Sequence, residues 1–394
     1  MKKILVISSW YPNIDNPGLG TFFRDQATLF EDEFDIRIFA GHMSPYVSRS
    51  KKLKNTIRFA LFRKVSIQKM NDYYLSPPYV YGFRFMPGLN KCKKANFRLI
   101  ISTFLNYFER NILPDWKPDL IHAQNTNMAG IIARYISEKF QIPYIVTDHH
   151  PFSPRLSHHI AAEIKLALIN SKKNCFVSEW QYRTYLLFNS SIRGQIIGNP
   201  VDSNIFKTRS LKGKKFVISH VSNADKPKDI GALMQTIKLF FEKVNTDDEF
   251  EFNLVGFSED IISNLRRRVE KYKWNKQLKF YEPQSKQFII DILQNSNVFL
   301  FTSIYESFGI APVEAMMCGV PVVSTNNGGI NEYMINGVNG IKCPIKDSEA
   351  LSDALIDIYK DKRKFDPKDV RASVVNKFSQ KVFKDRMLKI YQEN

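Results

Sequence analysis

Short apolar runs alternate with longer amphipathic segments through the first half of the chain. The apolar runs predict strands at residues 4–10, 35–40, 120–124, 144–150 and 174–178, and the amphipathic segments predict helices at 23–30, 95–112, 128–140 and 158–170. Strands that alternate with helices indicate βαβ units and a parallel sheet. The near-continuous apolar character of the runs favours strands that are buried on both faces.

The alternation starts again after a polar segment at residues 196–215, whose Gly, Pro and Asn residues are typical of a linker. Five more strands are predicted, at residues 216–222, 250–256, 278–282, 297–303 and 320–325. The last segment, 378–394, has helical periodicity and no strand after it. The pattern therefore predicts two doubly wound, Rossmann-like α/β domains that face each other across a cleft, with a boundary near residue 200. Ligands of such folds bind beyond the carboxyl ends of the strands.

The length of 394 residues and the 44% of hydrophobic residues agree with two folded domains. The first apolar run is shorter than the roughly 7–15 residues of a secretory signal, and no stretch approaches the ~20 apolar residues that span a bilayer. Four widely spaced cysteines, with no Cys-x-x-Cys pair, favour a reduced cytoplasmic setting over a disulfide framework. We therefore predict a cytoplasmic protein that is soluble or lies on a membrane surface.

The net charge of +18 is concentrated in residues 36–108, which contain 14 Lys or Arg and one acid, Asp72. Four apolar residues of this segment recur at i, i+4 spacing along one helical face: Leu53, Ile57, Leu61 and Val65. A basic amphipathic helix is typical of a membrane-surface element, so residues 49–98 are a candidate contact with an anionic membrane. A helix packed on the core with a solvated basic face fits the pattern equally well. No nucleic-acid motif accompanies the charge, and we predict no nucleic-acid partner.

The segment that carries the most chemical information surrounds Glu306 and Glu314. Glu306 follows a predicted strand, and Glu314 lies about one turn into a helix predicted to begin near Pro312, because proline favours the first helical positions. The N-terminus of such a helix attracts anions through its free N–H groups and its dipole. Gly309 lets a ligand approach the backbone closely. The segment predicts a site for a phosphorylated, hydroxyl-rich molecule, although Glu314 also fits a carboxylate that only stabilises the helix end.

The residues ESFGIAPVEAMMCGVPVVST and GGINEY resemble the donor-site signature of glycosyltransferase family 4, whose members are retaining enzymes of GT-B fold. The resemblance continues in order through both domains, at residues 8–30, 117–124, 142–150, 175–181, 196–206 and 219–237. It implies an N-terminal acceptor-binding domain at residues 1–200 and a nucleotide-sugar donor-binding domain at 201–375. A final helix at 376–394 would cross back to the first domain.

The resemblance also implies roles for residues of the C-terminal half. Glu314 would bind the donor ribose, and Glu306 would lie beside the transferred sugar. Three consecutive residues would hold sugar hydroxyls or diphosphate through their backbone groups: Phe308, Gly309 and Ile310. Lys228 corresponds to the family lysine that binds the diphosphate, where a positioned cation stabilises the leaving group. The family usually has an arginine three residues earlier; this chain has Asp225 there, and Lys226 is the candidate replacement, although a lysine lacks the arginine fork.

Two residues of the N-terminal half match family positions. Gly20 corresponds to a glycine whose backbone faces the diphosphate, whereas Gly18 fits a simple turn. His149 matches a histidine near the reacting sugar, where a neutral imidazole can hydrogen-bond a hydroxyl group. His150 follows directly, which leaves the register open by one residue.

The resemblance implies a retaining glycosyltransferase that moves a hexosyl group from an NDP-sugar to a carbohydrate or lipid-linked acceptor, in surface polysaccharide or glycolipid biosynthesis. No Asp-x-Asp occurs in the chain, so we expect no metal and no cofactor besides the NDP-sugar co-substrate. The resemblance implies front-face attack assisted by the leaving phosphate, and no clear second carboxylate nucleophile supports a double displacement. The alternatives are a nucleotide-sugar epimerase of the same fold and a non-catalytic carbohydrate- or membrane-binding relative; Asp225 supports the latter.

Overall fold

The computed structural model describes residues 1–13, 18–44, 47–69, 78–89, 93–208, 215–244, 249–272 and 274–394. The chain forms two compact units. The N-terminal unit consists of Met1–Val177, Thr184–Ile197 and Lys384–Asn394, and the C-terminal unit of Ser178–Arg183 and Gly198–Phe383. The chain enters the main part of the second unit at Gly198, two residues before the predicted boundary.

The N-terminal unit is built on an eight-stranded sheet with the order β3-β4-β2-β1-β5-β6-β7-β8. Its strands are β1 (Lys3–Ser8), β2 (Asp35–Met43), β3 (Ile67–Lys69), β4 (Tyr79–Phe85), β5 (Leu120–Gln124), β6 (Tyr144–Asp148), β7 (Lys173–Phe176) and β8 (Gln195–Ile196). All neighbouring strands are parallel except β3, which pairs antiparallel with β4 at the edge. The helices are α1 (Thr21–Thr28), α2 (Arg49–Phe62), α3 (Lys93–Asn111), η1 (Thr126–Gly130), α4 (Ile131–Phe140), α5 (His158–Ile169) and α6 (Glu179–Phe188). The boundary between the units falls within α6.

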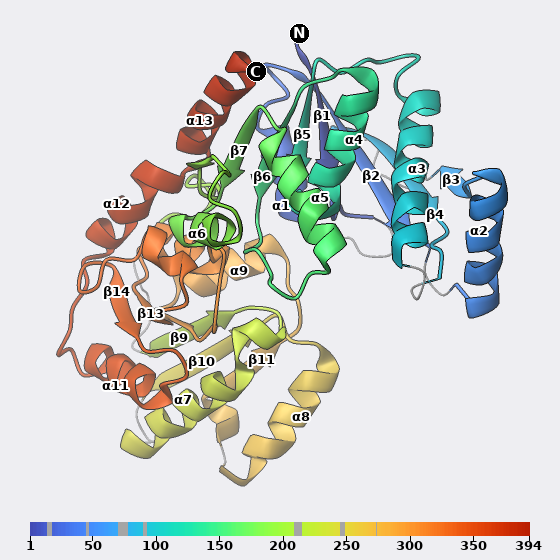
Figure 1. Ribbon diagram of the computed structural model, residues 1–394. Coiled ribbons are helices and arrows are strands. Elements are labelled where there is room, and N and C mark those ends of the chain that lie inside the picture. The colour runs from blue at the N-terminus through green and yellow to red at the C-terminus, as the bar shows by residue number, and fades with distance from the viewer. Residues whose placement is uncertain are drawn as a thin grey trace. The chain divides into compact units, whose positions relative to one another are not determined.

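The C-terminal unit is built on a six-stranded, fully parallel sheet with the order β11-β10-β9-β12-β13-β14. Its strands are β9 (Phe216–Val221), β10 (Phe250–Val255), β11 (Leu278–Tyr281), β12 (Val298–Phe301), β13 (Val322–Thr325) and β14 (Gly340–Cys343). The helices are η2 (Lys226–Lys228), α7 (Ile230–Lys243), α8 (Glu259–Val269), η3 (Glu270–Tyr272), η4 (Trp274–Lys276), α9 (Lys286–Gln294), α10 (Ile310–Met317), η5 (Gly329–Glu332), α11 (Ser348–Tyr359), α12 (Pro367–Phe378) and α13 (Gln380–Glu393). Helices α7, α8 and α11 cover one face of the sheet, and α9 lies on the other (Figure 1).

The two sheets confirm the prediction of two doubly wound, Rossmann-like domains. In chain order, the C-terminal sheet has the strand sequence 3-2-1-4-5-6, which is the Rossmann order. The N-terminal sheet has the same order, extended by β8 as a seventh strand, once its antiparallel edge strand β3 is left out. The strand order reverses between β9 and β12 in one unit and between β1 and β5 in the other. Loops at the carboxyl ends of these central strands are therefore the expected ligand sites of each unit.

Buried apolar side chains hold the layers together. In the C-terminal unit, Leu254 and Leu300 of the central strands are fully buried against residues of α7 and α11. In the N-terminal unit, Phe83 of β4 stacks on Tyr107 of α3 at 4.5 Å between ring centroids. Strand β4 was missed in the sequence, because its aromatic residues lie in the basic segment and were interpreted as part of an amphipathic surface.

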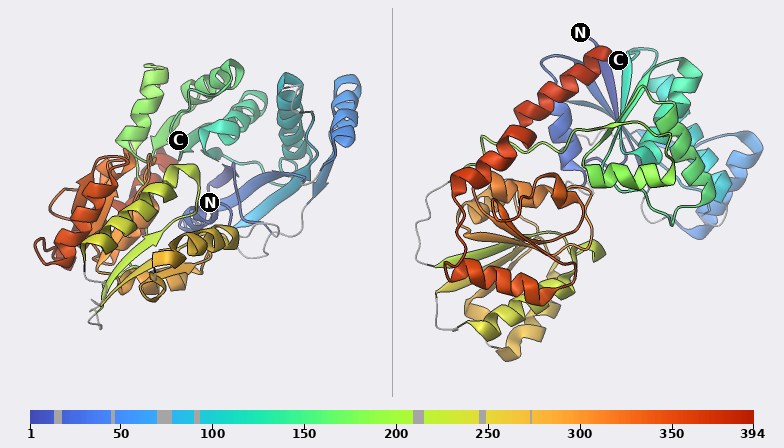
Figure 2. Two further views of the ribbon diagram at one scale, coloured as in Figure 1. Left: turned by 90° about the horizontal axis from the view of Figure 1, so that it is seen from below. Right: turned by 60° about the vertical axis from the view of Figure 1, so that its left-hand side comes forward.

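The C-terminal helix completes the N-terminal unit. Helix α13 begins in the C-terminal unit, and its residues from Lys384 onward belong to the N-terminal unit. There, the buried Tyr391 hydroxyl lies 2.7 Å from His122 Nδ1, and the Lys2 ammonium donates to the Tyr391 carbonyl at 2.8 Å. Lys2 and Tyr391, near the two ends of the chain, are therefore in contact, and both ends of the chain lie on the N-terminal unit (Figure 2).

Two predicted boundaries are wrong. Helix α2 ends at Phe62, because Arg63 has a left-handed backbone with φ 52°, so Val65 does not continue the predicted helical face. Helix α10 begins at Ile310 instead of near Pro312, which makes Glu314 its fifth residue. Within the described residues, no helix is long and apolar enough to cross a bilayer.

Candidate functional site

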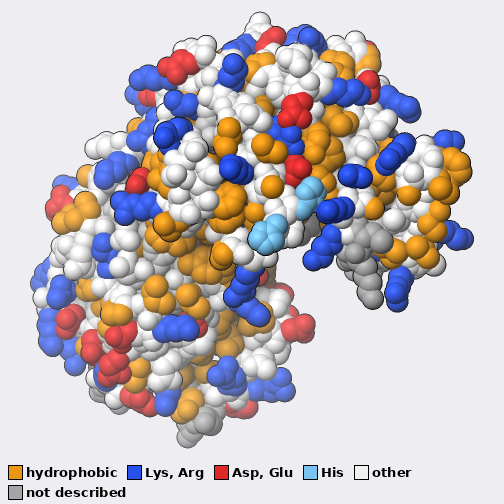
Figure 3. Space-filling model, viewed as in Figure 1, with side chains coloured by type: hydrophobic (Ala, Val, Ile, Leu, Met, Phe, Trp, Pro, Cys, Tyr) orange, Lys and Arg blue, Asp and Glu red, His pale blue; other side chains and the backbone are white. Residues whose placement is uncertain are grey.

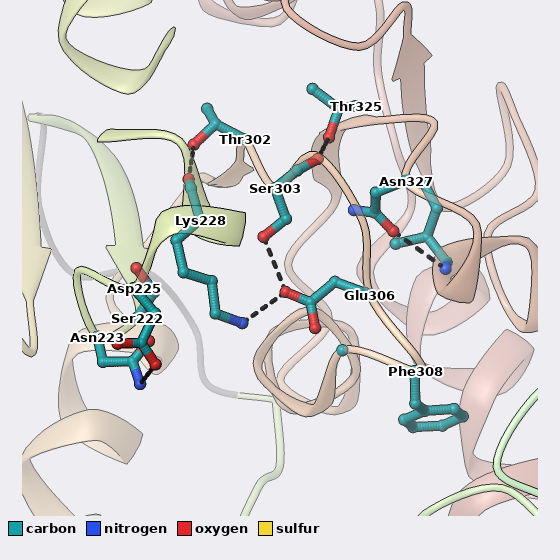
Figure 4. A network of polar contacts seen from close by, with 12 residues as sticks. Ser222, Asn223, Asp225, Lys228, Thr302, Ser303, Glu306, Phe308, Thr325 and Asn327 are labelled. Carbon is teal, nitrogen blue, oxygen red and sulfur yellow. Dashed lines mark hydrogen bonds and ion pairs between the residues drawn. The ribbon is translucent and has the colours of Figure 1, made fainter. Parts of the chain in front are cut away.

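The predicted donor-binding residues of the C-terminal unit lie after β9 and β12, at the point where the strand order reverses. Lys228 closes η2, a single turn that follows β9, and Glu306 lies in the loop after β12. The Lys228 ammonium contacts Glu306 Oε1 at 2.5 Å (Figure 4). Both side chains are mostly buried, with 23% and 13% of their surfaces exposed. The structure thus brings a cation and a carboxylate together where a Rossmann-like sheet binds its ligand.

Backbone and hydroxyl contacts fix the position of Lys228. The Thr302 hydroxyl donates to the Lys228 carbonyl at 2.9 Å, and the Ile304 amide donates to the Pro227 carbonyl at 2.7 Å. Asp229 then caps α7 by accepting from the Ala232 amide at 3.1 Å. The loop after β12 is therefore fastened to the start of α7, and the backbone from which the Lys228 side chain extends is fixed.

Glu306 is held by the loop after β13 and by a neighbouring hydroxyl. Its amide donates to the Asn327 carbonyl and its carbonyl accepts from the Gly329 amide, each at 3.0 Å. The Ser303 hydroxyl donates to Glu306 Oε1 at 2.8 Å (Figure 4). Asn327 is buried, and its Nδ2 has no hydrogen-bond partner among the described residues. Figure 4 shows this amide nitrogen directed toward the side on which Ser303 and Glu306 lie.

The N-terminus of α10 lies directly after Glu306. Gly309 takes the N-cap position with φ 85°, a left-handed conformation that favours glycine, and no side chain caps the helix. The buried Tyr333 hydroxyl lies 2.9 Å from the Phe308 carbonyl and 3.0 Å from the Gly309 carbonyl, which fixes the turn. A Cβ atom at Gly309 would lie 2.9 Å from that hydroxyl. The uncapped amide groups at the start of α10 are of the kind that can bind an anion.

Glu314 lies inside α10, more than one turn from its start. Burial raises the pKa of this carboxyl to about 7, and the positive charge of Lys286 only partly opposes the shift. A carboxyl group that titrates near neutral pH away from an ion pair is frequent at functional sites. Its position on the helix that follows the Lys228–Glu306 pair agrees with a ligand contact.

Asp225, which occupies the position of the family arginine, does not take over the role of that arginine. Asp225 is exposed, and its Oδ2 accepts from the Asn223 side-chain amide at 2.8 Å. Lys226 is exposed within η2. In the part of the chain that the structure describes, Lys228 is the lysine that pairs with Glu306. Lys226 is therefore available to solvent but is not held in the site.

In the N-terminal unit, Gly20 is the N-cap residue of α1 and has φ 67°. A Cβ atom there would lie 2.7 Å from the Trp10 carbonyl oxygen, so the position requires glycine both for its conformation and for its space. Gly18 lies in the preceding turn and is exposed. Of the two glycines, Gly20 and not Gly18 is thus the one at the left-handed N-cap position of α1.

His149 is buried at the end of β6, whereas His150 is exposed. His149 Nε2 lies 2.8 Å from Gln124 Oε1, and the Gln124 amide in turn donates to Gln26 Oε1 at 3.4 Å. This orientation assigns the ring proton of a neutral His149 to Nε2 and leaves Nδ1 as an acceptor. His149 also packs edge-on against Phe23, at 5.1 Å between ring centroids. Of the two histidines, His149 has the fixed orientation that a ligand contact needs.

Sequence reasoning missed three polar residues around the Lys228–Glu306 pair. They are Ser303, Asn327 and Tyr333. Ser303 and Asn327 follow the ends of β12 and β13, so the rule that ligands bind at the carboxyl ends of strands could have identified them. Tyr333 ends the GGINEY part of the signature, but its contacts with residues 24 and 25 positions earlier could not be predicted from the sequence.

Part of the chain matches a known protein family. Residues 201–373 match the family model described as glycosyl transferases group 1. An uncharacterized glycosyltransferase of Methanocaldococcus jannaschii is 26% identical over 266 residues, which cover 66% of this chain and 71% of the relative. Other curated relatives match over 44% and 54% of their own length.

Solved structures match over the whole chain. Sucrose-phosphate synthase of Thermosynechococcus elongatus superposes with a TM-score of 0.74 at 17% identity, over 100% of this chain and 99% of that protein. HepE of Anabaena, solved in complex with UDP, gives a TM-score of 0.72 at 19% identity, over 100% of both chains. These likenesses show the GT-B fold. The chain is thus a glycosyltransferase-class enzyme of GT-B fold, in which residues 201–373 form a glycosyl transferases group 1 domain.

Proposed function

We propose that the protein transfers a sugar from an NDP-sugar to a carbohydrate or lipid-linked acceptor, with retention of anomeric configuration. The observation that carries the proposal is the Lys228–Glu306 pair at the carboxyl ends of β9 and β12, next to the uncapped start of α10. A cation beside a helix N-terminus suits a diphosphate, and carboxylates suit sugar hydroxyls. The relatives include a structure solved with UDP-glucose, which supports a nucleotide-sugar donor.

In this proposal each group of the site has one task. The diphosphate draws the Lys228 ammonium away from Glu306, whose carboxylate then accepts hydrogen bonds from hydroxyls of the transferred sugar. Backbone groups of Phe308, Gly309 and Ile310 hold diphosphate oxygens or sugar hydroxyls. Glu314 accepts hydrogen bonds from the two ribose hydroxyls. The pairing in the free protein keeps both charges compensated until the donor arrives.

The proposed reaction is a front-face displacement. The bond between the anomeric carbon and the diphosphate oxygen breaks while the acceptor hydroxyl attacks from the same side, and the leaving diphosphate takes the acceptor proton. Lys228 and the start of α10 stabilise the charge that develops on the leaving group. Lys226 is a second cation for the diphosphate. We propose that no metal ion is needed, and transfer that continues unchanged in a chelator is the expected result.

We further propose that Gly20 and His149 of the N-terminal unit contribute to donor recognition, His149 by accepting a hydrogen bond from a sugar hydroxyl at Nδ1. The acceptor pathway that best suits such an enzyme is surface polysaccharide or glycolipid biosynthesis, at the inner face of the plasma membrane. Helix α2 is the surface that supports this location.

The test is a panel of UDP-, GDP- and ADP-sugars, with release of nucleoside diphosphate measured for the purified protein. Glu314→Ala is compared with Glu282→Ala, which removes an exposed carboxylate of the same unit. We expect release from one donor, lost in Glu314→Ala and retained in Glu282→Ala. Conversion of a donor into its epimer without release would establish the epimerase instead. Donor binding with no turnover for any acceptor would favour a non-catalytic carbohydrate-binding protein, for which Asp225 is the supporting residue.

A further inference from the structure

Helix α2 of the N-terminal unit carries charge of one sign. Its 14 residues include five basic side chains and no acid. These are Arg49, Lys51, Lys52, Lys54 and Arg58. None of the five forms an ion pair with any residue that the structure describes. Among the described residues, no acidic side chain therefore compensates the positive charge of this helix.

Helix α2 packs against the N-terminal unit through a small part of its surface. Asn55 and Phe59 are its buried residues. The Asn55 side-chain amide donates to the Met86 carbonyl at 2.6 Å, and the Thr56 hydroxyl accepts from the Leu89 amide at 2.9 Å. The alternative of a core-packed helix therefore holds only in part: α2 packs on its unit through Asn55 and Phe59, and its apolar stripe does not take part in the contact.

The apolar stripe faces solvent. Leu53, Ile57 and Leu61 are spaced four residues apart and have 45%, 49% and 68% of their surfaces exposed. At about 100° per residue, this stripe lies roughly opposite the side that carries Asn55 and Phe59. Phe62, at the end of the helix, is 66% exposed. In water, a helix gains no stability when its apolar stripe is exposed and an asparagine is buried.

Basic side chains border the stripe along its length. Lys54 and Arg58 each follow a stripe residue directly and are exposed. More exposed cations lie after the helix and at the start of α3, which packs beside it: Arg63, Lys64, Lys93, Lys94 and Arg98. Figure 3 shows Lys and Arg side chains in blue alternating with apolar ones in orange over the α2 lobe at the right. Residues 70–77 and 90–92, which include Asp72 and Cys92, lie outside the described residues.

We infer that α2 is a docking element for an anionic lipid surface, with its axis in the plane of the membrane. Leu53, Ile57 and Leu61 enter the acyl boundary, and the flanking lysines and arginines contact lipid phosphates. A nucleic acid would engage the cations but would leave the apolar stripe in water. An anionic bilayer satisfies both features at once, because it offers negative headgroups above an apolar layer. This inference goes beyond the proposed reaction and does not depend on it.

The test measures sedimentation of the full-length protein with vesicles of phosphatidylcholine, alone or mixed with phosphatidylglycerol. We expect binding to the anionic vesicles only, and weaker binding as salt is raised. Lys54→Glu combined with Arg58→Glu should lower the partition coefficient by at least roughly 25-fold, since each neutralised basic residue accounts for about fivefold. Ile57→Ser combined with Leu61→Ser should lower it about tenfold for each side chain that inserts.

Matched variants separate the membrane contact from general effects of charge and hydrophobicity. Lys165→Glu with Lys172→Glu makes the same charge change at exposed positions of the same unit, and Leu187→Ser removes an apolar side chain that is 88% exposed. Both should bind vesicles as the unaltered protein does, and Lys54→Arg with Arg58→Lys should retain binding. Melting temperatures check that each variant is folded.

Three results would overturn the inference. The first is equal sedimentation with neutral and anionic vesicles, and the second is an equal loss in the control variants. The third is capture of the protein by duplex DNA, dependent on Lys54 and Arg58, with no sedimentation on anionic vesicles. That last result would assign α2 to nucleic acid.

Discussion

Replacing Glu314 by glutamine should make the free protein more stable at alkaline pH while it weakens donor binding. Burial raises the pKa of this carboxyl from 4.5 to about 7, which corresponds to a cost of about 3 kcal/mol for ionising it in the folded state. Between these two pH values the folded protein binds more protons than the unfolded chain. Stability from this group is therefore complete at low pH and is lost as pH rises from about 4.5 through about 7.

Glutamine has the size of glutamate and carries no charge, so Glu314→Gln avoids this loss. We expect the variant to melt at nearly the same temperature as the unaltered protein at about pH 5, and several degrees higher at about pH 8. For a unit of this size, 1 kcal/mol shifts the melting temperature by roughly 2–4 °C, so about 3 kcal/mol sets an upper limit of roughly 12 °C. Differential scanning fluorimetry at the two pH values measures the difference.

The same variant should bind the donor less tightly, because glutamine offers one acceptor oxygen to two ribose hydroxyls. A lost hydrogen bond to a charged group weakens binding by roughly tenfold or more, which nucleotide titration calorimetry would detect. Glu282→Gln, at an exposed position of the same unit, should change neither property. If Glu314→Gln and the unaltered protein melt together at alkaline pH, burial does not strain the carboxylate and the argument fails.

Three further changes test other parts of the structure. Lys228→Ala should lower kcat by roughly 100-fold or more with a smaller change in KM, because the cation acts on the departing diphosphate; an equal fall in kcat for Lys226→Ala would contradict the distinction between the two lysines. Gly20→Ala should lower the melting temperature markedly, since its Cβ would lie 2.7 Å from a carbonyl oxygen, whereas Gly337→Ala, with φ 83° and open space around it, should cost only the roughly 1 kcal/mol of backbone strain. Tyr391→Phe removes the hydroxyl that contacts His122 and should destabilise the N-terminal unit by about 1 kcal/mol, measured by urea unfolding; no change would show that the contact is not stabilising.

The fold could be predicted where the buried strands are also apolar in sequence. β1 and β9 are apolar runs of six residues, and both are central strands. β4 was missed because buried Phe83 and exposed Leu61 belong to one basic, apolar-rich segment, and local composition is the same for both. Burial there depends on which residues of α3 lie opposite, and this is a long-range property.

The part of the site that could be predicted lies within continuous sequence motifs. The sequence places Lys228 and Glu306 after two strands, and the parallel sheet brings strand ends together. The direct ion pair between them could not be predicted, because it depends on the Thr302 and Ile304 hydrogen bonds that join the two loops. The exposure of Asp225 and Lys226 is likewise set by the geometry of the short η2 turn.

Helix α13 has a consequence for the order in which the protein can assemble. Lys384–Asn394 belong to the N-terminal unit, where Tyr391 contacts His122 and Lys2. These residues leave the ribosome after the whole of the C-terminal unit has been synthesised. While the C-terminal unit is being synthesised, the N-terminal unit therefore lacks residues 384–394, and its sheet cannot yet form the contacts of Tyr391.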